Sequence, residues 1–380
     1  MQNENPSRRD RRRESARQRG LRRRSVSLLR LNYALSAQAF KGDFSRKEAQ
    51  RRLSREVVRR YGRSEAYAMA ARLFSVKRTL AIHRSLGGET VVLVGRPAHV
   101  ETIRRAGLRV EGTRGGTFHV EAFTELPTAP RPDAVIVTVK SFDLGSALAG
   151  IGEALPPTST LLTQNGLGIT ESGRKSLTRA GWPRPEEFVV RCVHSIPALW
   201  VSAGVVRATG DGELLLPEPV GLAAPAIERF RRLLAGAGLP IRLVPSIARE
   251  EWRKAIVNAA INPVTALHRV PNGWLSSGPL RDEALVLLSE AREVAAAEGF
   301  PFDPAEIEGD LDRVVGATSE NRSSMLQDVE RGRGTEIEEI SGEILRRGEA
   351  RGLSLPATRK VLGRIRQLPR GRGGGTPQPS

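Results

Sequence analysis

Short apolar runs alternate with helix-like segments through the middle of the chain. Thr90–Val94, Ala134–Val139 and Ser159–Thr163 are rich in Val, Ile and Leu and have turn residues at their ends, as is typical of strands buried in a parallel sheet. Between the first two runs, His99–Ala106 predicts a helix that Gly107 ends. This alternation predicts an open α/β sheet, in which ligands bind at the carboxyl ends of the strands.

The pattern becomes mostly helical from about residue 224. Pro225 suits the first position of a helix, whose predicted apolar face carries Ile227, Phe230, Leu233 and Leu234. A short strand is expected at Ile241–Val244, and long helices run from Ala248 to about residue 350. The fold class is therefore α/β, a Rossmann-like parallel sheet followed by an all-α C-terminal domain.

These patterns divide the chain into four parts. The expected parts are a basic, partly disordered or helical extension (1–86), a Rossmann-like domain (87–245), a helical domain (246–366) and a disordered tail (367–380). Within the extension, residues 45–85 have helical spacing, and Ser45 is a candidate cap.

Charge is concentrated in the first part. Residues 1–78 hold 23 Lys and Arg against 7 Asp and Glu, a net charge of +16 out of +18 for the whole chain. The remaining body is nearly neutral, which argues against a nucleic-acid-binding body. No apolar stretch is long enough to span a membrane. The single cysteine, Cys192, excludes a disulfide framework and a multi-cysteine zinc site. We therefore expect no metal site and a reduced, cytoplasmic setting.

Polar residues form a stripe on one otherwise apolar predicted helix. Lys254, Asn258 and Asn262 are spaced i, i+4, i+8 among Ala, Ile and Val, so they share a narrow face. Buried polar groups require partners. The stripe either bonds to neighbouring helices or forms a cleft wall with one proton donor and two amides, and the spacing leaves both open.

A second polar segment precedes the end of the helical domain. Ser324 and Asn321 can hold a carboxylate through their hydroxyl and amide donors. The segment also fits a helix cap followed by a solvated charged face, and taken alone it favours this simpler interpretation.

Together these segments resemble the ketopantoate reductase (2-dehydropantoate 2-reductase) family over roughly residues 87–365. The matching pieces are Val139-Lys140, Gln164-Asn165-Gly166-Leu167-Gly168, Trp252-Arg253-Lys254 with Asn258 and Asn262-Pro263, Pro271-Asn272-Gly273, Glu320 to Asp328, and Thr335-Glu336-Ile337. This ordered set of motifs is specific.

The resemblance implies an NADPH-dependent enzyme that reduces 2-dehydropantoate to pantoate in pantothenate and coenzyme A biosynthesis. It implies Lys254 as the general acid. The implied substrate-binding residues are Asn165, Asn258, Asn262, Asn272 and Ser324. The implied cofactor contacts are Arg96, Lys140, Asn165 and Glu336. The expected partners are a small 2-keto acid and, at most, a second copy of the chain in a homodimer, without a membrane or nucleic acid.

The residue types suit this chemistry. Hydride addition to a keto acid builds an alkoxide, and an ammonium within hydrogen-bond reach can protonate it. Arg96 follows the Thr90–Val94 strand, where an arginine favours the 2′-phosphate of NADPH over NADH. The simpler interpretation of Arg96 is a solvated loop charge.

One expected motif is missing. The family begins with a strand, G-x-G-x-x-G and a helix, yet the chain contains no G-x-G-x-x-G. We therefore expect the sheet to lack a central strand and the pyrophosphate to lack its usual cradle. Three explanations fit this absence. The N-terminal extension replaces the missing unit, the protein is a degenerate, inactive reductase, or the reading frame differs upstream of about residue 87. The abrupt return of the family pattern at residue 87 favours the third explanation.

A function of a different class also fits the sequence. A catalytically impaired reductase-like protein can use the basic arm to bind nucleic acid or an acidic surface, because arginine runs bind phosphates. The arm contains no recognisable reading motif.

Overall fold

The computed structural model describes most of the chain, namely residues 80–84, 89–112, 115–127, 131–208 and 212–369. The basic arm, with its candidate cap Ser45, lies outside the described residues. The hypothesis of nucleic-acid binding through that arm therefore has no structural description.

A six-stranded sheet forms the centre of the α/β domain. In spatial order its strands are β5 (Glu121–Phe123), β2 (Glu89–Val94), β1 (Leu80–Arg84), β6 (Ala134–Val137), β7 (Ser159–Leu162) and β8 (Val189–Arg191). All except β1 run in one direction. The three expected apolar runs thus form β2, β6 and β7, and the last two end earlier than predicted.

β1 occupies a central position in this sheet and is antiparallel to both neighbours. Leu80 pairs with Leu93 of β2 and with Ile136 of β6. Two sequence expectations were wrong here: the sheet does not lack a central strand, and residues 80–84 are not helical. An unfilled gap would leave backbone groups of β2 and β6 unpaired, which is costly in a buried sheet. The replacement nevertheless differs from a Rossmann fold, because the chain enters this position at the ligand-binding edge.

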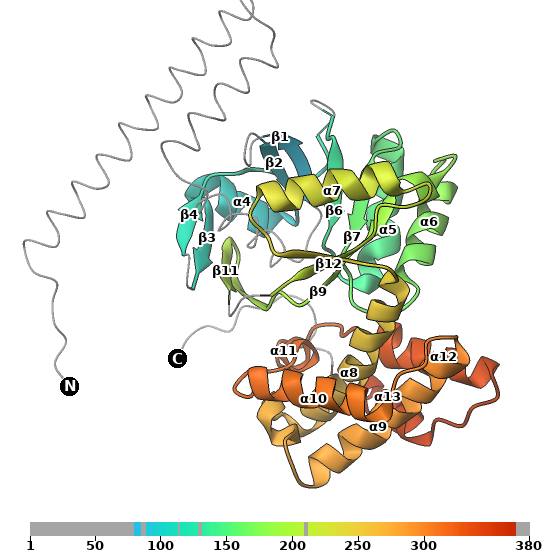
Figure 1. Ribbon diagram of the computed structural model, residues 1–380. Helices are drawn as coiled ribbons and strands as arrows, with labels where there is room; N and C mark the ends of the chain where they lie inside the picture. Colours follow the sequence, from blue (N-terminus) through green and yellow to red (C-terminus); the bar gives the residue numbers. More distant parts are fainter. Residues whose placement is uncertain (1–79, 85–88, 113–114, 128–130, 209–211, 370–380) are drawn as a thin grey trace, which may run out of the picture.

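Helices cover both faces of the sheet (Figure 1). α5 (Leu144–Ala154) and α6 (Ile169–Arg179) pack on one face, and α7 (Ala224–Gly236) packs on the other. α7 begins and ends close to its predicted bounds, and the side chain of Phe230 is fully buried. α4 (Pro97–Ala106) follows β2 and ends at Gly107, whose φ of 79° suits glycine.

Two smaller sheets complete the α/β domain. Their strands are β3 (Leu108–Glu111), β4 (Gly116–Phe118), β9 (Val193–His194), β10 (Ala198–Ser202), β11 (Val205–Ala208), β12 (Leu214–Pro217) and β13 (Ile241–Val244). Two short 3-10 turns are η1 (Ser141–Asp143) and η2 (Pro185–Glu187). β13 has the bounds predicted from the sequence.

The C-terminal domain is helical, as expected. Its elements are α8 (Ile247–His268), η3 (Asn272–Leu275), α9 (Pro279–Ala297), α10 (Pro304–Ala317), α11 (Ser324–Glu330), the π-helix η4 (Glu338–Gly342), α12 (Glu343–Ala350) and α13 (Pro356–Arg366). Ser246 caps α8 by accepting a hydrogen bond from the Arg249 amide at 3.3 Å. The apolar sides of these helices form one core of their own.

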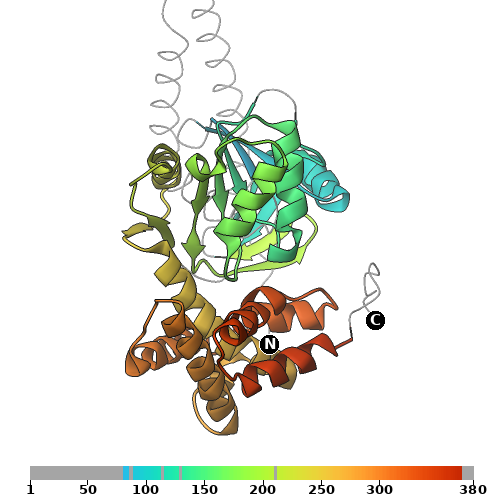
Figure 2. The same cartoon turned by 90° about the vertical axis from the view of Figure 1, so that its right-hand side faces the viewer.

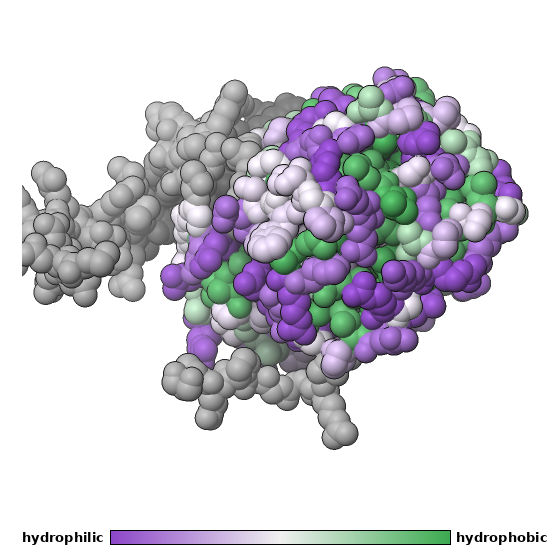
Figure 3. Space-filling model, turned by 90° about the horizontal axis from the view of Figure 1, so that it is seen from below, coloured by the Kyte–Doolittle hydropathy of each residue, from purple (hydrophilic) through white to green (hydrophobic). Residues whose placement is uncertain are grey.

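The long helix α8 leads from the α/β domain into the helical domain, which lies below it in Figures 1 and 2. The face seen from below is mainly hydrophilic, with smaller apolar areas between the charged groups (Figure 3). Among the helices of the described residues, none combines the length and apolar character needed to cross a bilayer.

Candidate active site

A buried carboxylate of the helical domain receives hydrogen bonds from the α/β domain. Glu336 Oε1 accepts from the Ser141 amide at 3.2 Å and from the Ser141 hydroxyl at 3.0 Å. Glu336 Oε2 accepts from Asn165 Nδ2 at 3.1 Å and faces Lys140 Nζ at 3.5 Å. Donors to both oxygens offset the cost of burying this charge. We call Lys140, Ser141, Asn165 and Glu336 the Glu336 network.

Strand ends place the donors of this network. Lys140 follows β6, and Asn165 follows the neighbouring parallel strand β7. Gln164 ties the segment after β7 to the end of β6, because its Nε2 donates to the carbonyl oxygens of Val137 at 2.8 Å and Val139 at 3.2 Å. The network therefore lies at the sheet edge where open α/β folds bind ligands.

Lys140 has a second buried partner in Asp328 of α11. The Lys140 side chain is 14% exposed, and its ammonium donates to Asp328 Oδ2. One ammonium thus faces two carboxylates of the helical domain, so it is a main electrostatic link between the domains.

A large cavity adjoins this edge. It has a volume of about 1010 Å³, and Arg96, Lys140, Trp200, Arg331 and Arg333 are among its lining residues. Arg96 lies apart from the Glu336 network: its guanidinium is 3.7 Å from Asp143, and its side chain is 74% exposed. Arg96 and Lys140 therefore share a cavity without sharing a partner.

The polar stripe of α8 contacts a strand. Lys254 Nζ donates to the His194 carbonyl oxygen at 2.6 Å, which ties α8 to β9. Asn258 is half-buried, and Asn262 is 5% exposed. This hydrogen bond joins Lys254 to a strand of the α/β domain, so the stripe lies at the junction of the two domains.

The remaining predicted substrate residues gather near the C-terminal half of α8. The Asn272 amide donates to the Asn321 carbonyl oxygen at 2.9 Å. The Asn272 side chain donates to Thr318 Oγ1 at 2.9 Å, while its buried Oδ1 has no hydrogen-bond donor among the described residues. A buried amide oxygen of this kind suits a ligand hydroxyl.

Ser323, rather than Ser324, caps α11. Ser323 Oγ accepts from the Leu326 amide at 3.1 Å and from Thr265 Oγ1 of α8 at 2.7 Å. The expected helix cap therefore exists, and Ser323 forms it. Ser324 is half-buried at the first position of α11, and its role stays a prediction.

Comparisons with known proteins decide the family. Residues 79–221 match the family described as ketopantoate reductase PanE/ApbA, and residues 246–368 match its C-terminal part. A 2-dehydropantoate 2-reductase of Archaeoglobus fulgidus is 33% identical over 287 residues, covering 75% of this chain and 92% of that relative. The chain belongs to the ketopantoate reductase family. The resemblance seen in the sequence is thus confirmed, and the match begins at residue 79 instead of 87.

Other members and solved structures agree. A 2-dehydropantoate 2-reductase of Pyrococcus horikoshii is 32% identical, covering 71% of this chain and 86% of the relative. The crystal structure of a PanE/ApbA family ketopantoate reductase from Ralstonia eutropha has a TM-score of 0.64 at 30% identity, covering 73% and 89%. A D-mandelate dehydrogenase with NADH and anilino(oxo)acetate has a TM-score of 0.67 at 21% identity, covering 79% and 93%, and shows a shared fold.

The cavity fits one end of the family's cofactor. Its volume suits a large ligand, and its cationic side chains suit the phosphorylated adenosine end of NADPH. Among the described residues, no G-x-G-x-x-G stands between a strand and a helix to hold the pyrophosphate. β1 also enters the central position from the opposite direction.

Three further residues hold this site together, and none of them was predicted from the sequence. Ser141 directly follows the predicted cofactor contact Lys140, and Asp328 ends the matching motif that begins at Glu320. Neither residue was assigned a role from the sequence. Buried Arg191 at the end of β8 bonds to Glu251 Oε1 at 2.5 Å and to the Gln164 carbonyl oxygen at 2.7 Å. Its position at the carboxyl end of a strand was the available signal.

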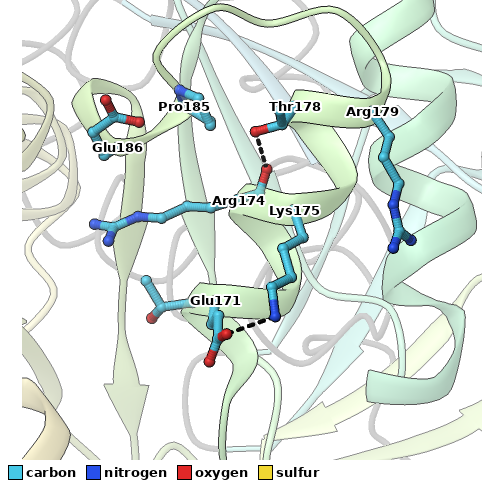
Figure 4. Close-up of a pocket in the computed structure, with 8 residues that line it drawn as sticks. Glu171, Arg174, Lys175, Thr178, Arg179, Pro185 and Glu186 are labelled. Carbon is cyan, nitrogen blue, oxygen red and sulfur yellow. Dashed lines mark hydrogen bonds and ion pairs between the residues drawn. The ribbon is translucent and has the colours of Figure 1, made fainter.

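A separate hollow lies on the outside of α6 (Figure 4). It has a volume of about 480 Å³ and lies between α6 and the η2 turn. Glu171 and Lys175 form an ion pair at 2.6 Å within it. None of the predicted site residues lines this hollow, so we assign it no part in the reductase site.

Proposed function

We propose that the protein reduces 2-dehydropantoate to pantoate with NADPH, as a step in pantothenate and coenzyme A biosynthesis. Membership of the family supports this proposal. The observation that carries it is the Glu336 network, in which three implied cofactor residues, Lys140, Asn165 and Glu336, meet from two domains. Arg96 lines the adjoining cavity.

In this proposal Lys254 is the general acid. NADPH, when bound, supplies the hydride that adds to the C2 carbonyl carbon. The Lys254 ammonium donates a proton to the carbonyl oxygen as its negative charge develops, and solvent then reprotonates the amine. The His194 carbonyl oxygen orients the ammonium through the 2.6 Å hydrogen bond.

Amides and a hydroxyl hold the substrate. We assign Asn165, Asn258, Asn262 and Asn272 to its carbonyl and hydroxyl groups, because neutral amides orient these groups without competing for the proton. Ser324 is assigned to the carboxylate. The buried, unpartnered Oδ1 of Asn272 supports its assignment to the substrate hydroxyl.

In this proposal the two domains bind different ligands. The α/β domain, residues 87–245 with β1 added to its sheet, binds the cofactor, and the helical domain, residues 246–366, binds the substrate. The partner is a small 2-keto acid, and the protein acts in the cytoplasm as a monomer or homodimer, without binding a membrane or nucleic acid.

Purified full-length protein tests the proposal through 2-dehydropantoate-dependent oxidation of NADPH. Glu336→Gln removes one of the two carboxylate charges that Lys140 faces, and it should lower kcat/KM for NADPH by about 10- to 100-fold. Glu338→Gln, which alters an exposed neighbour paired with Arg366 at 2.7 Å, is the matched control and should stay within about twofold of the unmodified protein. Absence of turnover, or equal loss in both variants, would contradict the proposal.

A further inference from the structure

Two arginines of the helical domain lie beside the cavity that Arg96 lines. Arg331 and Arg333 follow α11, and the Arg331 guanidinium donates to the Trp200 carbonyl oxygen at 3.1 Å. The Arg333 guanidinium lies 4.3 Å from the centroid of the Trp200 ring, a cation–π distance. Trp200 belongs to β10, so these contacts cross between the domains.

The turn that carries the two arginines is fixed by backbone hydrogen bonds. The Gly332 amide donates to the Val329 carbonyl oxygen at 3.0 Å, and the Arg333 amide donates to the Asp328 carbonyl oxygen at 2.8 Å. Gly332 has a φ of 60°, as in the glycine turns that end many helices. Because the Asp328 side chain also binds Lys140, the turn is anchored to the α/β domain.

These arginines differ from most others in the helical domain. Arg253, Arg281, Arg347 and several more form ion pairs with Asp or Glu. Arg331 and Arg333 form no ion pair with a carboxylate among the described residues. Their charge is therefore not neutralised by a salt bridge at the cavity.

The local charge is predominantly positive around Arg333. Burial, followed by the charges of Arg331 and Arg96, lowers the pKa of the Arg333 guanidinium, and the Asp328 carboxylate opposes this only in part. An anion bound between these groups would relieve the repulsion.

We propose that Arg331 and Arg333, held against Trp200, form with Arg96 a two-domain binding site for the 2′-phosphate of NADPH. The proposal rests on the proposed function and names residues that determine cofactor choice. Guanidinium groups suit a phosphate because they donate paired hydrogen bonds to its oxygens. The site would supply phosphate contacts to a chain whose described residues lack the glycine-rich cradle.

Two nucleotides that differ by one phosphate test this site. We would measure the Kd of adenosine 2′,5′-bisphosphate and of adenosine 5′-monophosphate by calorimetry with the full-length protein. Arg331→Gln/Arg333→Gln should raise the Kd of the bisphosphate by about 10- to 100-fold. It should change the Kd of the monophosphate by less than about threefold, because that ligand lacks the 2′-phosphate.

Matched variants separate this effect from net charge and from misfolding. Arg229→Gln/Arg232→Gln on α7 removes the same charge outside the cavity and should leave both Kd values nearly unchanged. Arg331→Lys/Arg333→Lys keeps the charge without the paired donors, so its bisphosphate affinity should be intermediate. Arg96→Gln should weaken only the bisphosphate.

The outcomes distinguish this site from the reductase function. Unchanged bisphosphate affinity in Arg331→Gln/Arg333→Gln, or equal loss for both nucleotides, overturns the site even where 2-dehydropantoate turnover is normal. Failure of the unmodified protein to prefer the bisphosphate also overturns it. Selective loss in a protein that does not reduce 2-dehydropantoate supports the site and overturns the function.

Discussion

At the scale of single residues, Lys254 carries the chemical step of the proposed reaction. Lys254→Ala should lower kcat by a factor on the order of 10² to 10⁴, the usual value of a positioned proton donor. The fold should persist, because alanine suits the middle of α8. Turnover of 2-dehydropantoate at saturating NADPH measures the effect.

Lys175→Ala is the control for this experiment. Lys175 is an exposed lysine on α6, paired with Glu171 at 2.6 Å, and such pairs contribute little. Its kcat should match that of the unmodified protein. Normal turnover in Lys254→Ala would remove Lys254 from the mechanism.

A second residue-scale expectation concerns the buried ion pair of Arg191 and Glu251. The Arg191 side chain is 4% exposed, and that of Glu251 is 11% exposed. Arg191→Met leaves the Glu251 carboxylate without its partner, so stability should fall by about 3–5 kcal/mol. Arg191→Met/Glu251→Leu removes both charges and should recover much of the loss. Urea unfolding compares the variants, and a double variant no more stable than Arg191→Met would contradict this account.

The sequence indicates some of these residues and not others, for a physical reason. Lys140 and Asn165 stand directly after apolar runs, so their place at the sheet edge follows from local pattern. Glu336 follows only from the family resemblance, because its partners lie more than 170 residues away. Long-range contacts of this kind leave no local periodicity.

At the scale of elements, apolar pattern predicts those strands and helices that are buried. β2, α4 and α7 were found close to their observed bounds, because burial selects their apolar positions. β13 was also found, although only Val244 of its four residues is buried. β10 and β11 were missed: their half-exposed sides weaken the signal. β1 was misassigned because the helical spacing upstream was extended through it, and its strand conformation is set by its neighbours β2 and β6.

The π-helix η4 brings the helical domain against the turn after β7. The Leu167 amide donates to the Glu339 carbonyl oxygen at 3.1 Å. Gly166 has a φ of 111°, and a Cβ there would lie 2.6 Å from the same oxygen. Only glycine therefore permits this approach, and the turn that carries Asn165 docks directly on η4.

Glu339 makes the stability of this junction depend on pH. Burial, with the charges of Glu336 and Glu338, raises the pKa of the Glu339 carboxyl. A raised folded-state pKa in an acid favours folding at low pH, and this contribution is lost as pH rises through the folded pKa. Glu339→Gln should therefore raise the Tm at pH 7, and the gain should shrink as pH falls toward about 4.3, the ordinary value for Glu.

Thermal unfolding of Glu339→Gln and Glu338→Gln over this pH range is the measurement. Glu338 is ion-paired with Arg366 on the surface, so its replacement should not raise the Tm at pH 7. A gain for Glu339→Gln that is the same at every pH would contradict titration as the cause.

At the scale of the whole molecule, the missing glycine-rich unit should limit cofactor affinity. A chimera in which a strand, G-x-G-x-x-G and helix replace residues 1–84 should bind NADPH at least about tenfold more tightly than the unmodified chain, because backbone N–H groups at a helix start bind the pyrophosphate. Calorimetry of the two proteins measures the difference.

The control is the same chimera with its glycines replaced by alanine, which keeps the added strand and helix but blocks close backbone approach. It should lose most of the gain. Equally tight binding by the unmodified chain would show that its own N-terminal segment supplies a pyrophosphate site.

The direction of β1 also changes the order in which the sheet can assemble. β1 and β2 are separated by only residues 85–88 and pair from Arg84↔Glu89 to Leu80↔Leu93, so they form a hairpin of low contact order. Hairpins close in about 1–10 µs, far faster than parallel strands joined by long crossovers. The centre of this sheet can therefore form first, with the free side of β1 as a template for β6. The slow folding step then becomes the addition of β6, β7 and β8.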